Sequence, residues 1–255
     1  MFAERFAEQG WLRINGLFPR ELVEAARAGY DDQFETLVTP REGHRGYTHA
    51  DGDDKRFILT PRLTGAMLDP ALWANPLVMA ILAPLLGNDL LIDNLTIVTA
   101  FPGARDQQLH RDHAPLFPEQ PQVGAGLNPY AITLVIPLID LDEDTGTTRL
   151  VTGSHRGIAE GPSEFPLVQR GDCFLMDYRL AHLGTANRSD RARPMLFIVY
   201  SRPWFTDIRN LKRQERLRLS REDLAALPPA HWPLFRRLAT KGGLDFSQRE
   251  LFPET

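Results

Sequence analysis

Between residues 90 and 202 the chain repeats short runs of aliphatic and β-branched residues that end at turn sequences. These runs occupy residues 90–101, 130–140, 148–152, 173–178 and 194–202. Short strands at close intervals, with turns between them, favour a β-sandwich or barrel over alternating βαβ units. No other feature of the sequence restricts the possible folds as much.

The segments on either side of these runs favour helices. Residues 19–27 and 75–86 each have a proline at a first-turn position, which suits a helix start. Residues 11–16 predict a short strand, residues 40–56 a polar loop, and the tail from Leu211 is again helical in pattern. We expect a mainly β fold with flanking helices. It is expected to form one domain over residues 1–255, comprising a mixed helical part (1–89), a β core (90–205) and a C-terminal helical extension (206–255).

Composition excludes several classes of protein. The chain has 29 Lys and Arg against 33 Asp and Glu, a net charge of −4, and 43% hydrophobic residues. This balance excludes a disordered chain or a coiled coil and argues against nucleic acid as a partner. The most apolar stretch, residues 71–87, is broken by Asn75, Pro76 and Pro84, so we expect no membrane association. The single cysteine, Cys173, excludes an internal disulfide and fits a cytoplasmic location.

The sequence His110-Arg111-Asp112 has the spacing of a metal-binding pair. On an extended segment side chains alternate, so His110 and Asp112 point to one face and Arg111 to the other. His182, just beyond the run that Gly171-Asp172 opens, is the candidate third ligand. Two imidazoles and one carboxylate on one face of an octahedron form the facial triad of non-haem Fe(II) oxygenases.

Arg193 adds a second clue, because it stands eleven residues after His182 at the start of the last strand run. A buried guanidinium at the mouth of a barrel pairs with a carboxylate through two parallel hydrogen bonds. A 2-oxo acid bound to iron by its keto and carboxylate oxygens needs such an anchor for its far carboxylate.

Several motifs in this order resemble the phytanoyl-CoA dioxygenase family of Fe(II)/2-oxoglutarate-dependent oxygenases. The matching pieces are Phe6-Ala7-Glu8-Gln9-Gly10-Trp11, Gly16-Leu17-Phe18, Gln108-Leu109-His110-Arg111-Asp112, Pro137-Leu138-Ile139-Asp140 with Thr145-Gly146, Val151-Thr152-Gly153-Ser154-His155, and Gly171-Asp172 through His182-Leu183-Gly184, Asn187 and Arg193 to Pro203-Trp204-Phe205. The resemblance implies a double-stranded β-helix core, that is, a jelly roll of cupin-like type.

The resemblance also implies roles for particular residues. His110, Asp112 and His182 would bind Fe(II), and Arg193 would anchor 2-oxoglutarate. Gln108 and Thr133 would make secondary contacts to this cosubstrate. The chain departs from the family by having Leu134-Val135-Ile136 where an aromatic residue is common, and Gly184 where serine is common.

The sequence thus predicts a dioxygenase that uses Fe(II), 2-oxoglutarate and O2 to hydroxylate or otherwise oxidise a C–H bond of a small molecule, such as an intermediate of a biosynthetic pathway. Succinate and CO2 would be released. Two alternatives stay open: a cupin-like metal enzyme without an oxo acid, and a non-catalytic jelly-roll binding module. Residues 113–129, rich in proline, are expected to border the active-site mouth. His44 and His49 lie in the polar N-terminal loop, and the chain is expected to be a monomer or homodimer.

Overall fold

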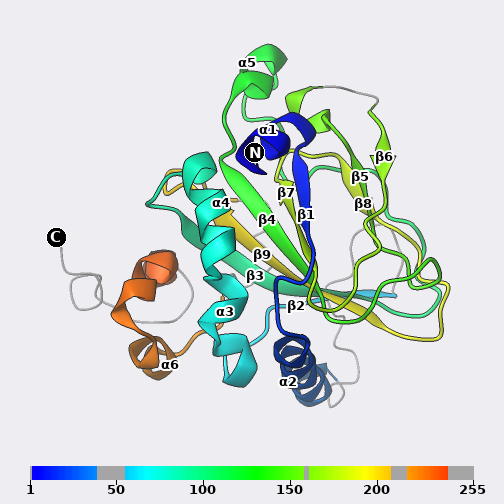
Figure 1. Ribbon diagram of the computed structural model, residues 1–255, viewed down its shortest axis with the longest axis vertical. Helices are drawn as coiled ribbons and strands as arrows, with labels where there is room; N and C mark the ends of the chain where they lie inside the picture. Colours follow the sequence, from blue (N-terminus) through cyan, green and yellow to red (C-terminus); the bar gives the residue numbers. More distant parts are fainter. Residues whose placement is uncertain (1, 39–54, 158–160, 208–216, 241–255) are drawn as a thin grey trace.

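Two antiparallel β-sheets form the centre of the molecule (Figure 1). The computed structural model describes residues 2–38, 55–157, 161–207 and 217–240. The large sheet has the strand order β1-β7-β4-β9-β3-β2 and the small sheet the order β6-β5-β8. The strands are β1 (Trp11–Ile14), β2 (Arg56–Leu59), β3 (Leu91–Ala100), β4 (Ala131–Pro137), β5 (Thr148–Val151), β6 (Ser163–Glu164), β7 (Cys173–Asp177), β8 (His182–Gly184) and β9 (Arg193–Ser201).

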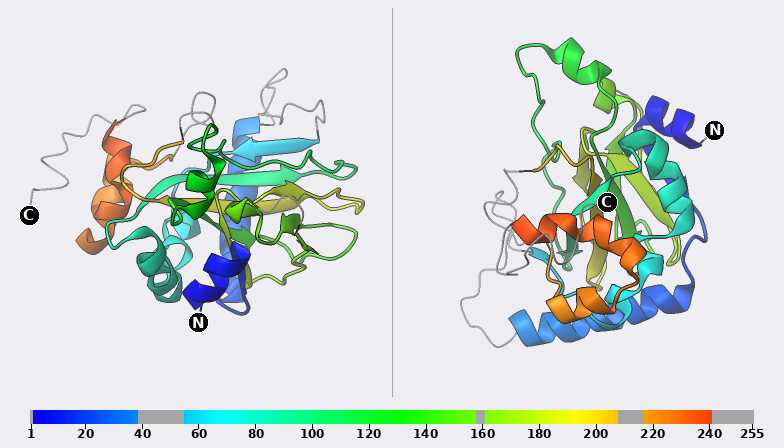
Figure 2. Two further views of the ribbon diagram at one scale, coloured as in Figure 1. Left: turned by 90° about the horizontal axis from the view of Figure 1, so that it is seen from above. Right: turned by 90° about the vertical axis from the view of Figure 1, so that its left-hand side faces the viewer.

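Helices α3, α4 and α6 lie on one side of the large sheet, and the small sheet lies on its other side (Figures 1 and 2). The α-helices are α1 (Phe2–Gln9), α2 (Arg20–Val38), α3 (Pro70–Trp73), α4 (Pro76–Leu86), α5 (Pro121–Gly126) and α6 (Arg221–Ala226). The 3-10 helices are η1 (Gly65–Leu68), η2 (Ser154–Arg156) and η4 (Pro229–Thr240). In both views the C-terminal segment α6–η4 lies at the helical side of the molecule, away from the small sheet.

Strand β4 shows why strands of the large sheet have continuous apolar sequences. Ile132, Leu134 and Ile136 pack among the buried residues on the helical side. Val135 belongs to a second buried cluster between the two sheets, and Thr133 faces a cavity there. Because both faces are covered, every residue of the strand is buried. A sheet buried on both sides loses the polar alternation of a half-exposed one.

The expected strands and helices are present where the structure describes them. Each of the five strand runs forms a strand, and residues 11–16 supply β1. Helices α2 and α4 lie where prolines predicted helix starts, although α2 continues to Val38. The predicted loop was placed one residue too far, because Arg56 begins β2. His44 and His49 fall outside the described residues.

In the described part of the C-terminal segment, α6 and η4 are helical. Within the described ranges, no helix has the length and apolar character needed to cross a membrane.

Candidate active site

His110, Asp112 and His182 come together at one point between the sheets. Their candidate ligand atoms all lie within 4.8 Å of one another. The Asp112 Oδ1 atom is 3.5 Å from the Nε2 of His182 and 4.0 Å from the Nε2 of His110. The backbones of the two histidines form an antiparallel bridge with hydrogen bonds of 2.9 and 2.8 Å. This bridge places one imidazole beside the other, with ring centroids 4.5 Å apart.

Hydrogen bonds within each short segment orient the two imidazoles. The Nδ1 of His110 lies 2.8 Å from the carbonyl oxygen of Gln108, and the Nδ1 of His182 lies 2.9 Å from that of Leu180. A carbonyl only accepts, so Nδ1 carries the proton and the Nε2 lone pair faces Asp112. Burial lowers the pKa of His182, against the opposing effect of Asp112, and so favours the neutral imidazole that metal binding requires.

This donor set fits Fe(II). Two neutral imidazole nitrogens and one carboxylate oxygen are the facial ligands of non-haem iron oxygenases, and the opposite face of such a metal stays open for other ligands. Arg111, between His110 and Asp112, has other partners: its Nε donates to the carbonyl of Arg179 at 2.9 Å and its guanidinium NH2 to that of Ser154 at 3.2 Å. The side chains of His110 and Asp112 converge as the sequence predicted, although Arg111 also lies among the residues that line the cavity.

A cavity of about 380 Å³ extends from this triad along the inner face of the large sheet. The strand register orders its wall: Arg193 pairs with Ala100, Met195 with Val98, Phe197 with Thr96, and Val199 with Asn94. At about 3.3 Å per residue, this wall spans about 20 Å from Arg193 to Val199. One end is cationic, and the other is apolar or neutral.

Two buried arginines form the cationic end. Arg193 and Arg56 are each only 3% exposed. Both donate to the carbonyl of Thr185, at 2.8 Å from Arg193 and 2.9 Å from Arg56. Burial, and then the neighbouring Arg56, lower the pKa of Arg193 to about 9. Two adjacent buried cations favour the binding of an anion at this end of the cavity.

Arg56 was not found by sequence reasoning, which ended the polar loop at this residue. The Arg56-Phe57-Ile58-Leu59 stretch pairs with β3 over its full length, and this places Arg56 opposite Ala100. The apolar residues that follow Arg56 were the available signal for a strand. Without the pairing register, nothing in the sequence aims its guanidinium at Arg193.

The predicted secondary contacts differ in position. Thr133 is 1% exposed and lines the cavity, and its hydroxyl has no hydrogen-bond partner among the described residues. Gln108 also lines the cavity but is exposed, and its carbonyl orients His110. Gln107, which the sequence analysis did not single out, bonds the backbone N–H of Gly184 at 2.8 Å.

The absence of a side chain at Gly184, where the family resemblance suggests serine, has a steric cause. A Cβ at this position would lie 2.6 Å from the Gln107 side-chain oxygen and 3.6 Å from the Arg56 guanidinium carbon. The glycine therefore leaves room for the Gln107 side chain, while Arg56 stays at ordinary contact distance.

An aromatic cluster stands beside the apolar end. Tyr130, Tyr178 and Phe205 are buried together, and the half-buried Leu116 packs against them. Tyr178 lines the cavity and donates its hydroxyl to Asp207 at 2.6 Å. Residues 113–129 thus contact this cluster through Leu116, and none of them is among the described residues that line the cavity.

Comparison with known proteins decides the family. The model of the phytanoyl-CoA dioxygenase family matches residues 6–195, which is most of the chain. The chain belongs to the phytanoyl-CoA dioxygenase family. The family assignment made from the sequence is confirmed, as are the enzyme class, an oxidoreductase, and at family level the use of Fe(II), 2-oxoglutarate and O2.

Individual relatives are distant. Dioxygenase af480 of Aspergillus fumigatus is 25% identical over 223 residues, covering 80% of this chain and 67% of the relative. The chain spans about two thirds of the length of the first curated relatives that it matches.

Solved structures share the fold. AviO1 from Streptomyces viridochromogenes superposes with a TM-score of 0.62 at 19% identity, covering 80% of this chain and 95% of that one. The epimerase SnoN, solved with Fe3+, alpha ketoglutarate and nogalamycin RO, gives a TM-score of 0.59 at 16% identity, covering 79% and 82%. The predicted jelly-roll fold class is confirmed.

Proposed function

We propose that this family member oxidises a C–H bond of an uncharged, largely apolar small molecule, with His110, Asp112 and His182 holding Fe(II). Arg193, assisted by Arg56, binds the far carboxylate of 2-oxoglutarate. One observation supports this assignment above all: a complete two-histidine, one-carboxylate set and a buried pair of cations line the same cavity.

The bound iron would supply the activation of dioxygen that drives oxidative decarboxylation of 2-oxoglutarate to succinate and CO2. The residues of the chain provide geometry. His110 and His182 present their Nε2 atoms because backbone carbonyls hold the opposite ring nitrogens. Arg193 and Arg56 fix the cosubstrate at the cationic end, so its oxo-acid group faces the triad.

The substrate class follows from the opposite end of the cavity. Asn94, Thr96 and Val199 line it, and Tyr178 adds a phenol whose proton is donated to Asp207. The nearby cation Arg111 already donates to two backbone carbonyls. Such a wall suits apolar surface with one or two hydroxyl or carbonyl groups. Dioxygenase names among the relatives and the nogalamycin compound in the SnoN structure support a biosynthetic intermediate.

An anaerobic titration tests the proposal. Fe(II) followed by 2-oxoglutarate should produce the visible charge-transfer band of a bidentate oxo-acid complex, and admission of air should release succinate. The His182→Ala variant should lose the band. His113→Ala is the matched control, because His113 contacts Phe205 and lies outside the triad.

Two results would favour the rival functions. Fe(II) binding that 2-oxoglutarate does not alter would indicate a metal enzyme without an oxo acid. Failure to bind Fe(II) at micromolar concentration would indicate a non-catalytic module.

A further inference from the structure

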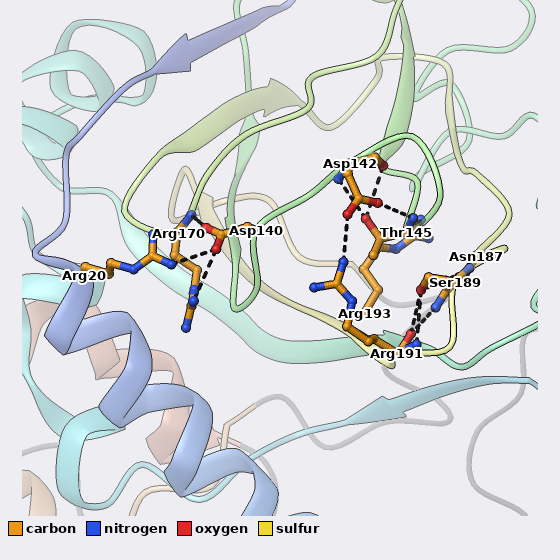
Figure 3. Close-up of polar contacts among 9 residues, drawn as sticks. All are labelled: Arg20, Asp140, Asp142, Thr145, Arg170, Asn187, Ser189, Arg191 and Arg193. Carbon is orange, nitrogen blue, oxygen red and sulfur yellow. Dashed lines mark hydrogen bonds and ion pairs between the residues drawn. The ribbon is translucent and has the colours of Figure 1, made fainter.

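The acidic turn that follows β4 lies directly against Arg193 (Figure 3). Within this turn the Thr145 N–H donates to Asp142 Oδ1 at 2.7 Å, and the Asp142 N–H donates to the Thr145 hydroxyl at 2.9 Å. The Gly146 N–H donates to the Asp142 carbonyl at 2.9 Å. These reciprocal bonds fix the direction of the Thr145 carbonyl, in a residue that is completely buried.

That carbonyl holds the guanidinium of Arg193. One terminal nitrogen, NH1, donates to the Thr145 carbonyl at 2.7 Å, and the other, NH2, donates to the Thr185 carbonyl at 2.8 Å. Of the five guanidinium N–H groups, these two bonds fix the plane and leave the others for a ligand. In the described part of the chain, Arg193 has carbonyls as hydrogen-bond partners and makes no ion pair with a carboxylate.

Gly146 allows the turn to approach this closely. Its φ is +72°, a conformation that side-chain-bearing residues rarely adopt. A Cβ there would lie 2.3 Å from the Ala186 carbonyl oxygen and 2.6 Å from Arg193 NH1. The turn therefore packs against the 185–193 loop with no space for a side chain.

The outer side of the turn is fastened to the same loop. Arg191 NH2 lies 2.7 Å from Asp142 Oδ2 in an exposed ion pair. The Asn187 amide donates to the carbonyls of Arg191 and Ala100, at 2.7 and 2.9 Å. The two Asp142 oxygens thus have separate tasks: Oδ1 shapes the turn, and Oδ2 contacts the loop (Figure 3).

We propose that the Asp142–Gly146 turn positions the cosubstrate anchor, so that Asp142 and Thr145 set the affinity for 2-oxoglutarate through the Thr145 carbonyl and Arg193. Neither residue contacts the cosubstrate. This inference depends on the proposed function, because it requires Arg193 to bind 2-oxoglutarate.

The test measures the dissociation constant of 2-oxoglutarate for the Fe(II)-loaded protein without oxygen, together with the melting temperature of the metal-free protein. Asp142→Ala removes the acceptor for Thr145 N–H and should weaken 2-oxoglutarate binding about tenfold, the loss of about one hydrogen bond to a charged group. Asp142→Asn keeps that acceptor and should restore affinity. Arg191→Ala removes only the exposed pair and should bind as the wild type does.

The Thr145→Val and Thr145→Ser pair repeats the test inside the turn, in case Asp142→Ala fails to fold. Valine removes the hydroxyl that accepts from Asp142 N–H and should weaken binding, whereas serine should retain it. A lower melting temperature with unchanged affinity in the alanine and valine variants would overturn the inference, because it would show a purely structural role.

Arg193→Gln separates this inference from the proposed function. If Arg193→Gln weakens binding and neither turn variant does, the positioning role is wrong and the anchor stands. If Arg193→Gln also leaves the affinity unchanged, the anchor assignment itself fails.

Discussion

The part of the cavity that holds the triad, named the metal end, and the cationic end are built in different ways. At the metal end, each histidine takes its orientation from a carbonyl two residues earlier in the chain. At the cationic end, Arg56 and Arg193 come from the edge strand β2 and the central strand β9, and their acceptors come from two further loops. At the metal end each imidazole is therefore oriented locally, and one long-range backbone bridge joins the two histidines, whereas the cationic end requires four distant segments. We expect substitutions at the metal end to abolish succinate formation, and substitutions at the cationic end to raise the KM for 2-oxoglutarate by graded amounts.

The largest effect is expected at the metal end. Asp112→Ala removes the only carboxylate of the triad and should lower succinate formation by about a thousandfold or more, through loss of Fe(II). Succinate release and Fe(II) binding measure this. Glu119→Ala, an exposed acid on the following segment, is the matched control and should retain activity. Full succinate formation by Asp112→Ala would show that the ligand assignment is wrong.

At the cationic end we expect a graded response. Arg193→Gln should raise the KM for 2-oxoglutarate about 100-fold with a smaller change in kcat, because a fork-shaped, charge-assisted contact is lost. Arg56→Gln should raise it only about tenfold, since in the proposed function Arg56 assists the anchor and Arg193 remains in place. Arg193→Lys, which keeps the charge without the fork, should fall between them.

Steady-state succinate assays at varied 2-oxoglutarate provide these values. Equal effects of Arg193→Gln and Arg56→Gln would mean that the two arginines share the anchor equally.

The smallest effect is expected at Asp140, two residues before the Asp142–Gly146 turn. Burial tends to raise the pKa of this carboxyl, but hydrogen bonds from Arg20 and Arg170 outweigh it and lower the pKa to about 2 (Figure 3). The ionised form therefore stabilises the fold above the unfolded pKa of about 3.9, and this contribution is lost as the pH falls towards 2.

Asp140→Asn should lower the free energy of unfolding at pH 7 by about 1 kcal/mol, less than the pKa shift implies because much of the side chain is solvated. Urea unfolding should show the gap to the wild type narrowing between pH 4 and pH 2, with the KM for 2-oxoglutarate unchanged. Glu143→Gln, an exposed acid in the same turn, is the control. A raised KM for 2-oxoglutarate in Asp140→Asn would mean that Asp140, like the Asp142–Gly146 turn, acts on Arg193.

Sequence reasoning succeeded where the information is local. The spacing of His110 and Asp112 put both side chains on one face, because an extended segment alternates whatever it packs against. Runs of apolar residues marked β4 and β9 for the same reason. Sequence reasoning failed at Arg56, since the predicted loop included the first residue of β2, and at Gln107, whose partner Gly184 is far along the chain.

The sequence by itself determined the residue types and their order: an antiparallel β core, two histidines and a carboxylate of ligand spacing, and one arginine at a strand start. Only the tertiary structure decided which groups share the cationic end, and how the Asp142–Gly146 turn meets Arg193. The physical reason is that side chains alternate along an extended backbone, so the relative direction of two side chains that are two residues apart follows from the sequence alone. The meeting of Arg56 with Arg193 depends on the register of β2 against β3 and of β3 against β9, which is set by packing of the whole sheet.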